Sequence, residues 1–177
     1  MQNIRTKFFS FFLLSTASIL FSCNETPPGV PLAVATTSTT DSIITVSQSV
    51  FKFSCVFPKE FLSANPADIH FNDASGELEM KAGEDFGLVM TEGKPNLAYI
   101  KKDLEEDLMW KVKMVENDSR KIVYQRHLPD GSAYLMQFIQ HIQLAGKDYT
   151  VRTAPQGSFN EQQLEVMRKV VDSMNAI

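Results

Sequence analysis

The sequence predicts an α+β domain over residues 42–177, built on an antiparallel β-sheet that is covered at least partly on each side. Three observations predict this class. Most of the segment consists of short runs in which apolar residues alternate with polar ones, as in antiparallel strands. Two longer segments repeat apolar residues every three or four positions, as amphipathic helices do. One predicted strand, 133–143, carries apolar side chains on both faces, so both faces need cover.

The strands are expected in the order in which the alternating runs occur. The first part of the domain contributes Ile43–Ser47, Val50–Phe57, Ile69–Asn72, Glu77–Met80 and Phe86–Thr91, with a short irregular or helical stretch after Pro58. The second part contributes Trp110–Val115, Lys121–Leu128, Ala133–Gln143 and Asp148–Thr153. The segment Pro129–Gly131 has the chemistry of a hairpin loop, so the runs on either side of it are expected to pair.

Two amphipathic helices are expected. The first opens at Pro95 or Asn96 and runs to about Trp110, and one of its faces carries Leu97, Ile100, Leu104 and Leu108. The second, Glu161–Met174, follows Ser158–Glu161, which has the spacing of a capping box, and repeats Leu164, Met167, Val171 and Met174. Near the end of the first helix, the consecutive acids Glu105, Glu106 and Asp107 would point about 100° apart, so we expect a solvated face there and not a calcium site.

The first 23 residues have the features of an export signal. Arg5 and Lys7 precede an apolar run, Phe8–Leu20, that is short for a membrane span, and the small residue Ser22 stands before Cys23. The ending Leu20–Cys23 resembles the bacterial lipobox, although Phe21 is bulkier than the residue usual at its place. The resemblance implies cleavage after residue 22 and a new N-terminus at Cys23, which is diacylated and usually acylated again.

The chain is therefore expected to have three parts: a lipoprotein signal peptide (1–22), a lipidated cysteine with a flexible tether (23–41), and a single α+β domain (42–177). The tether contains three prolines and five threonines and has too few large apolar residues to fold by itself. Cleavage removes Arg5 and Lys7 and no acidic residue, so the formal net charge changes from −4 to −6. This negative net charge argues against nucleic acid as a partner and against electrostatic binding to a membrane surface.

The order of elements carries a family resemblance. An early aromatic strand runs into a proline (Phe51–Pro58), a middle helix and a long hairpin follow, and a Gly-x-x-Tyr-x-Val strand (Gly146, Tyr149, Val151) precedes a terminal helix that ends near Ser173–Met174. This order resembles the PsbP-like fold, which includes the small bacterial DcrB-like lipoproteins. The resemblance covers nearly the whole domain. It implies an α/β/α sandwich and a binding or assembly protein, and it supplies no catalytic constellation.

Few residues are candidates for chemistry. Alternation places Cys55 on the same face as Phe51, Phe53 and Phe57, so we expect a sheltered core residue and not a nucleophile. If residues 121–143 form a hairpin, His127 lies opposite Ala133 or Tyr134 and His141 lies opposite Ser119 or Arg120. The two histidines are then about 20 Å apart and cannot share a zinc ion.

The remaining candidates also favour structural roles. His70 could join either histidine, but one free cysteine is too few for a closed zinc site. Ser132 and Asp130 share a loop near His127, but turn chemistry explains Asp130 and Gly131 completely, which argues against a catalytic triad. The eight methionines lie mainly at core-facing positions, which favours packing over copper binding. We expect no catalytic residue, no metal and no cofactor, lipid attachment at Cys23, and a ligand-binding site that the sequence does not locate.

Two functions remain open. The first is a non-enzymatic, membrane-anchored lipoprotein that binds or helps assemble another cell-envelope component, expected to be a protein. The second is a small-ligand carrier or an unconventional enzyme that uses a cleft between the sheet and a helix. In both, the lipid on Cys23 holds the domain to a membrane of the bacterial envelope. The outer membrane is favoured over the inner one, and the domain is expected in the periplasm or at the surface.

Overall fold

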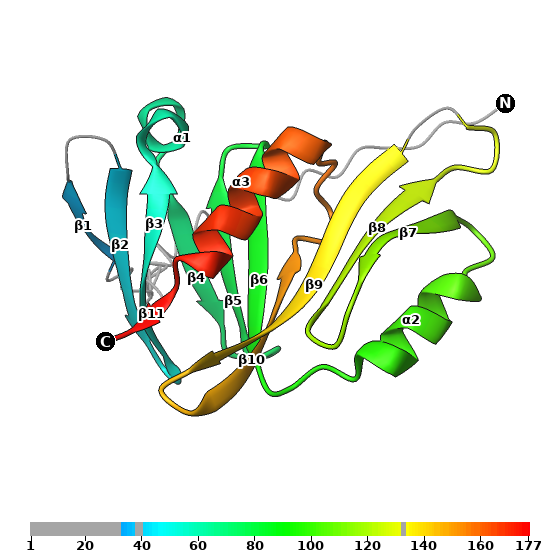
Figure 1. Ribbon diagram of the computed structural model, residues 1–177. Helices are drawn as coiled ribbons and strands as arrows, with labels where there is room; N and C mark the ends of the chain where they lie inside the picture. The colour runs from blue at the N-terminus through cyan, green and yellow to red at the C-terminus, as the bar shows by residue number, and fades with distance from the viewer. Residues whose placement is uncertain (1–32, 38–40, 132–133) are drawn as a thin grey trace, which may run out of the picture. The chain divides into compact units, whose positions relative to one another are not determined.

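Eleven strands and three helices occur in the residues that the structure, a computed structural model, describes, which are 33–37, 41–131 and 134–177 (Figure 1). The strands are β1 (Ala33–Thr37), β2 (Asp41–Gln48), β3 (Phe51–Pro58), β4 (Asp68–Asn72), β5 (Glu77–Ala82), β6 (Phe86–Glu92), β7 (Lys111–Asn117), β8 (Lys121–His127), β9 (Tyr134–Leu144), β10 (Lys147–Thr153) and β11 (Asn175–Ala176). The helices are α1 (Lys59–Ala64), α2 (Leu97–Glu105) and α3 (Glu161–Asp172). All of them belong to one structural unit, Pro31–Ile177.

These strands form two antiparallel sheets. The smaller sheet has the order β1-β2-β3-β11 and the larger one has the order β4-β5-β6-β10-β9-β8-β7. Consecutive strands are mostly neighbours, but β10 returns to lie beside β6, and β11 returns to lie beside β3. The α+β class with antiparallel strands is thus confirmed. The strands are divided between two sheets, whereas the sequence predicted one.

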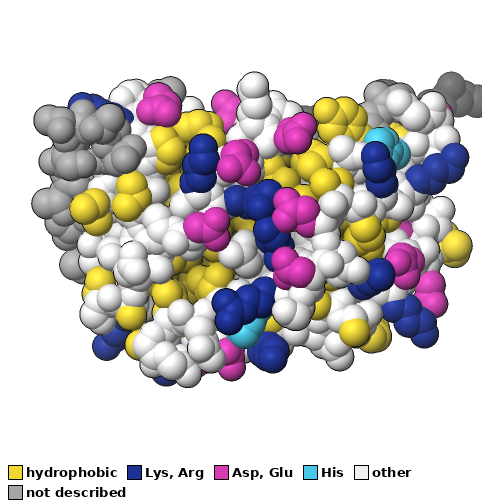
Figure 2. All heavy atoms as spheres, viewed as in Figure 1, with side chains coloured by type: hydrophobic (Ala, Val, Ile, Leu, Met, Phe, Trp, Pro, Cys, Tyr) yellow, Lys and Arg dark blue, Asp and Glu magenta, His cyan; other side chains and the backbone are white. Residues whose placement is uncertain are grey.

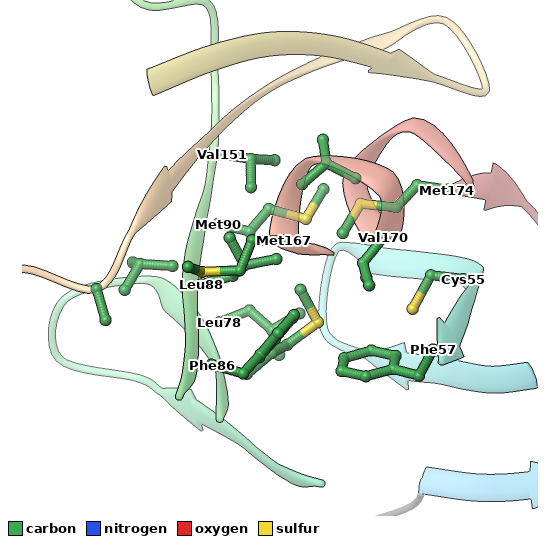
Figure 3. Close-up of a cluster of buried hydrophobic side chains, with 14 of the residues drawn as sticks. Cys55, Phe57, Leu78, Phe86, Leu88, Met90, Val151, Met167, Val170 and Met174 are labelled. Atoms are coloured by element: carbon green, nitrogen blue, oxygen red, sulfur yellow. The ribbon is translucent and has the colours of Figure 1, made fainter. Parts of the chain in front are cut away.

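The main core lies between the smaller sheet, α3 and one face of the larger sheet. Alternate residues of β3 point into it, and each of these side chains is at most 1% exposed: Phe51, Phe53, Cys55 and Phe57. Figure 3 shows Cys55 and Phe57 facing side chains of β5, β6, β10 and α3. The predicted apolar face of the last helix is confirmed, because Leu164, Met167 and Val171 of α3 are buried, as is Met174 just beyond its end. Burial of apolar surface is the main stabilising contribution here.

A second, smaller cluster lies on the opposite face of the larger sheet. Along β8, Val123 belongs to the main core, whereas its neighbours Ile122 and Tyr124 belong to the second cluster. Successive strand residues point to opposite faces, so the two clusters lie on the two sides of the sheet. Helix α2 covers the second cluster with the buried Leu104. Strand β9 is divided in the same way, which confirms that both of its faces are covered.

Helix α2 ends earlier than the sequence predicted. Its last residue is Glu105, five residues before Trp110, and Leu108 is 99% exposed, so its assignment to the buried face was wrong. The cause is Asp107, whose Oδ1 accepts the backbone N–H groups of Met109 (2.8 Å) and Trp110 (3.1 Å). An aspartate that binds the backbone in this way competes with the helical hydrogen bonds.

Helix α3 begins at the predicted residue, but its cap differs from the prediction. Asn160 and Gln163 form the capping box, because the Asn160 side chain accepts the Gln163 N–H at 3.0 Å and the Gln163 side chain accepts the Asn160 N–H at 2.7 Å. The predicted box was two residues earlier, at Ser158–Glu161. The helix ends at Asp172, two residues before the predicted end, with Ser173 as its C-cap.

The long hairpin has the predicted register. His127 pairs with Tyr134, and the N–H of His141 donates to the carbonyl of Arg120 at 2.7 Å. Gly131 has a φ of 74°, the left-handed conformation that the turn sequence predicted. In the N-terminal part, β1 lies within the segment 23–41 assigned to the tether, and it pairs with β2 from Ala33 opposite Val46 to Thr37 opposite Ser42.

Candidate functional sites

Cys55 is the cysteine that lies among the described residues, and it is not placed to act as a nucleophile. Cys55 lies in the main core, and burial raises its pKa to about 12, so its thiol stays protonated at neutral pH. This agrees with the predicted core position. Cys23, the predicted site of lipid attachment, lies outside the described residues, as does Ser132.

The three histidines lie apart. His141 Nε2 is 2.8 Å from Asp148 Oδ1, whereas the ring of His127 packs on Tyr134 with 5.8 Å between ring centroids. His70 is on β4, at the far edge of the larger sheet. Within residues 41–131 and 134–177, no group of three His, Cys, Asp or Glu side chains is arranged to hold a metal ion.

A cleft of about 440 Å³ lies between the end of α3 and β9. Its lining comes from the β7–β8 turn, β8, β9 and the end of α3: Asp118, Arg120, Lys121, Gln140, His141, Ile142, Gln143, Leu144, Val171, Asp172 and Met174. The second function predicted from the sequence uses a cleft of this kind, between a sheet and a helix.

Several charged side chains in and around this cleft neutralise one another. The hydrogen bond from His141, followed by one from Gln143, lowers the pKa of Asp148. Glu116 lies 2.6 Å from Lys121 and 2.8 Å from Arg168, and the hydrogen bond from Lys121 is the largest cause of its lowered pKa. Figure 2 shows basic and acidic side chains interleaved in the middle of this face. We therefore find no concentration of one sign of charge that would select a ligand.

A smaller cavity of about 210 Å³ lies against β8, β9 and β10, beside the second cluster. We call it the Gln137 cavity. Tyr124 and Arg126 line it from β8, Gln137 from β9, and Arg152 from β10. Arg126 pairs with Leu135 and Arg152 pairs with Ile139, so each arginine is one diagonal step from Gln137.

Two of the residues that line this cavity each have a buried polar atom without a hydrogen-bond partner. Gln137 is only 3% exposed, and its Oε1 is one of three buried side-chain polar atoms that accept or donate no hydrogen bond among the described residues. Arg126 Nε is another. Such an atom costs about 1–3 kcal/mol, so native proteins contain few of them. Both atoms are fully buried, so neither is open to a ligand in the cavity, and they are a donor and an acceptor on residues one diagonal step apart.

Large apolar side chains are exposed at one end of the larger sheet. Leu108 is 99% exposed and Met109 is 75% exposed in the α2–β7 connection, and Tyr134, at the start of β9, is 52% exposed. Lys111 pairs with His127 and His127 pairs with Tyr134, so the α2–β7 and β8–β9 connections lie at the same end (Figure 1). We call Leu108, Met109 and Tyr134 the apolar corner.

The sequence patterns did not locate either site. The helical period assigned Leu108 to a buried face, and only the backbone bonds of Asp107 show otherwise. A signal for the cavity was present, because Gln137 is a polar residue in a strand that is apolar on both faces. Its relation to Arg126 and Arg152 required the pairing of three strands.

Comparison with known proteins finds no family model, no curated protein and no solved structure that matches this chain. Among the helices of the described residues, none combines the length and the apolar character needed to cross a membrane. The fold itself defines an α+β protein with two antiparallel sheets.

Proposed function

We propose that this chain is a lipid-anchored protein of the bacterial cell envelope whose folded domain binds another envelope protein and catalyses no reaction. The anchor is lipid on Cys23 after removal of residues 1–22. The outer membrane is the favoured location, with the domain in the periplasm or at the surface. The charged start, the apolar run and the ending Leu20–Cys23 support the anchor.

We also propose that the domain is PsbP-like, an α/β/α sandwich of the kind found in DcrB-like lipoproteins. Two features support this proposal. Helices α3 and α2 pack against opposite faces of the larger sheet, and the aromatic strand Phe51–Pro58 belongs to the main core. In this fold the helices would be the two outer layers, with the smaller sheet extending the layer that contains α3.

The exposure of Leu108 is the observation that carries the proposed binding. Burial of a leucine or methionine side chain contributes about 1.5–3 kcal/mol, and in the apolar corner Leu108 is almost fully exposed and Met109 is three-quarters exposed. Tyrosine and methionine are enriched in the centres of protein interfaces. A partner that offers an apolar socket would bury these side chains.

Charge favours a protein over lipid as the occupant of this corner. The mature chain has a formal net charge of −6 if residues 1–22 are removed, and anionic headgroups repel such a chain. Immediately before the corner, Glu105 and Glu106 are exposed and make long contacts, 3.8 Å each, with Lys101 and Lys102. The exposed Lys111 follows the corner, so the partner surface that fits best is an apolar pocket whose rim carries charges of both signs.

Photo-crosslinking in intact cells tests this proposal. A photoreactive residue at position 108 of the full chain should give a discrete adduct with an envelope protein. The matched control is position 177, since Ile177 is an apolar residue 61% exposed at the C-terminus. Equal adducts from both positions would contradict the proposal. Adducts with lipid alone would assign the corner to the membrane instead.

A substitution separates binding from folding. Leu108→Asp should abolish recovery of the crosslinked partner, because an aspartate cannot be buried in an apolar socket without a large desolvation cost. The melting temperature should stay unchanged, since Leu108 is 99% exposed. Ile177→Asp should change neither.

A second function, carriage of a small ligand, is favoured by the Gln137 cavity, which Gln137 and two arginines line. It uses residues different from those of the apolar corner. The two functions can therefore occur in the same molecule and can be tested separately.

A further inference from the structure

We propose that Met109 is a modification site, at which a peroxide oxidises the thioether to a sulfoxide, and that the sulfoxide prevents the apolar corner from binding its partner. The first part of this inference concerns the reactivity of Met109 alone. The second part rests on the proposed function, because it concerns the same corner. Together they give the corner a reversible redox control.

Exposure separates Met109 from the other methionines that the structure describes. It is 75% exposed, whereas Met114 is half-buried against the second cluster. The remaining described methionines are all buried in the main core: Met80, Met90, Met136, Met167 and Met174. A peroxide has to reach a lone pair of the sulfur, so the exposed thioether should react before the buried ones.

The thiol of Cys55 does not compete for the oxidant. Cysteine reacts with peroxides as the thiolate, and burial raises the pKa of Cys55 to about 12, so its thiol stays protonated. Met109 therefore carries the most accessible sulfur of the described residues.

The backbone of the α2–β7 connection keeps this side chain in solvent. Asp107 Oδ1 accepts the N–H of Met109 at 2.8 Å and the N–H of Trp110 at 3.1 Å, which fixes a turn at this point. Met109 belongs to neither apolar cluster. Oxidation would therefore add a polar oxygen at the surface and leave the packing of both clusters unchanged.

The reaction is a two-electron oxidation by hydrogen peroxide or an alkyl hydroperoxide. A sulfur lone pair attacks the peroxide oxygen that carries hydrogen, so that an S–O bond forms and the O–O bond breaks. The sulfur is oxidised and the peroxide is reduced. The second oxygen leaves as water or an alcohol after it takes the proton of the first. Methionine sulfoxide reductases reverse this change.

The sulfoxide opposes binding at the corner because its oxygen is a hydrogen-bond acceptor. An apolar pocket offers that oxygen no donor, so its burial there is unfavourable. Met109 follows Leu108 directly, and the proposed partner covers both side chains. A bound partner would in turn shield the thioether from peroxide, so binding and oxidation should oppose each other.

Peroxide treatment of the full-length protein, purified in detergent, tests the modification. Peptide mapping by mass spectrometry should find that sulfoxide forms at Met109 at least tenfold faster than at any buried methionine, and faster than at Met114. The melting temperature should stay unchanged when Met109 is fully oxidised. The matched control, Met114→Leu, should leave the rate at Met109 unchanged. A rate at Met109 no higher than at the buried methionines would overturn the site.

Crosslinking from position 108 in intact cells tests the effect on binding. Met109→Gln places a polar amide in the corner without any oxidant and should lower the yield of the adduct at least tenfold. Hydrogen peroxide added before irradiation should lower the yield of the chain that retains Met109. In Met109→Leu the yield should be the same with and without peroxide, because leucine has no sulfur.

The outcomes distinguish this inference from the proposed function. An unchanged yield in Met109→Gln, or an equal loss with peroxide in Met109→Leu, would overturn the redox control and leave the proposed binding intact. If position 108 gives no adduct even without peroxide, the proposed binding is wrong, and its redox control is wrong with it. The oxidation site itself is decided by the peptide mapping, which needs no partner.

Discussion

Ser173 joins the end of α3 to the smaller sheet through a single side chain. Its hydroxyl donates to the carbonyl of Val170 at 2.7 Å and accepts the backbone N–H of Val56 at 2.8 Å. Strand β11 pairs with β3 only at Ser54 and Phe53, so it stops before Val56. The serine therefore continues, with its side chain, the hydrogen bonding that the short strand leaves incomplete.

Ser173→Ala should lower the free energy of unfolding by about 1–2 kcal/mol, because it leaves the partly buried N–H of Val56 without an acceptor. Urea unfolding followed by circular dichroism would measure the loss. Ser63→Ala is the control, since the Ser63 hydroxyl makes an exposed bond to Lys59. A loss as large in Ser63→Ala would show that the Val56 bond is not the cause.

Cys55 should be unreactive in the folded protein. Burial raises its pKa to about 12, so a thiol reagent at pH 8 should modify it only after denaturant is added. The raised pKa also makes stability depend on pH. This contribution is fully present below the thiol's ordinary pKa and is lost as the pH rises toward 12, because only the unfolded chain ionises in that window. Rapid modification of the native protein would contradict the burial.

The residue scale shows what a strand pattern can predict. Cys55 was placed in the core because alternation is a local property, and the structure confirms it. Gln137 lies in an equally regular strand, yet the pattern gave no reason to single it out. The surroundings of Gln137 are set by the side chains of β8 and β10 that lie beside it. Which strands pair with β9 cannot be derived from a local pattern.

At the scale of elements, the turn between β9 and β10 contains a residue in an unfavourable backbone conformation. Leu144 pairs with Lys147, and the two residues between them both have positive φ, 51° for Ala145 and 77° for Gly146. This is the conformation of a two-residue hairpin turn that favours Asn-Gly. Alanine tolerates positive φ poorly because of its Cβ, whereas asparagine adopts it more readily.

Ala145→Asn should therefore stabilise the protein by about 0.5–1 kcal/mol. Gly146→Ala should have the opposite effect, about 1 kcal/mol or more of destabilisation. A Cβ on Gly146 would meet no atom within 4 Å, so that loss would come from the backbone conformation alone. Chemical denaturation of both variants checks the pair. A destabilised Ala145→Asn would show that the turn is held by contacts other than its own conformation.

The two main helices show where the periodicity of a sequence stops being informative. The stripe of α3 is buried as predicted, and the helix begins at the predicted residue. In α2 the same periodicity continued to Leu108, but Asp107 ends the helical segment by binding two backbone N–H groups. A regular apolar spacing therefore marks which residues could share a face, and local hydrogen bonding decides where the helix stops.

Strand β7 forms an edge of the larger sheet next to the apolar corner. Its exposed side chains include Lys111 and Lys113, and the pairing with β8 shifts register between Met114 and Glu116. Lysines and a bulge on an edge strand oppose the addition of another strand. A partner at the corner should therefore contact side chains and should not extend the sheet.

At the scale of the whole molecule, the fold depends on two long returns of the chain. Strand β10 lies beside β6, and β11 lies beside β3, which places the C-terminal residues against the smaller sheet. Local patterns identified most strands and both longer helices. They could not reveal that the strands divide into two sheets, because that division depends on pairings between residues far apart in sequence.

Cys23 is the residue on which the proposed location of the whole molecule depends. One acyl chain holds a protein to a membrane only marginally, whereas two or more hold it stably, so a multiply acylated Cys23 should keep the protein in the membrane fraction. Labelling of cells with a fatty acid should mark the wild-type protein, and its intact mass should correspond to a chain that begins at Cys23. Cys23→Ser should be unlabelled and should remain an unprocessed or soluble precursor.

Cys55→Ala is the matched control and should keep the label, because Cys55 is buried in the main core. A labelled Cys23→Ser protein would place the lipid elsewhere and would remove the basis for the proposed anchor.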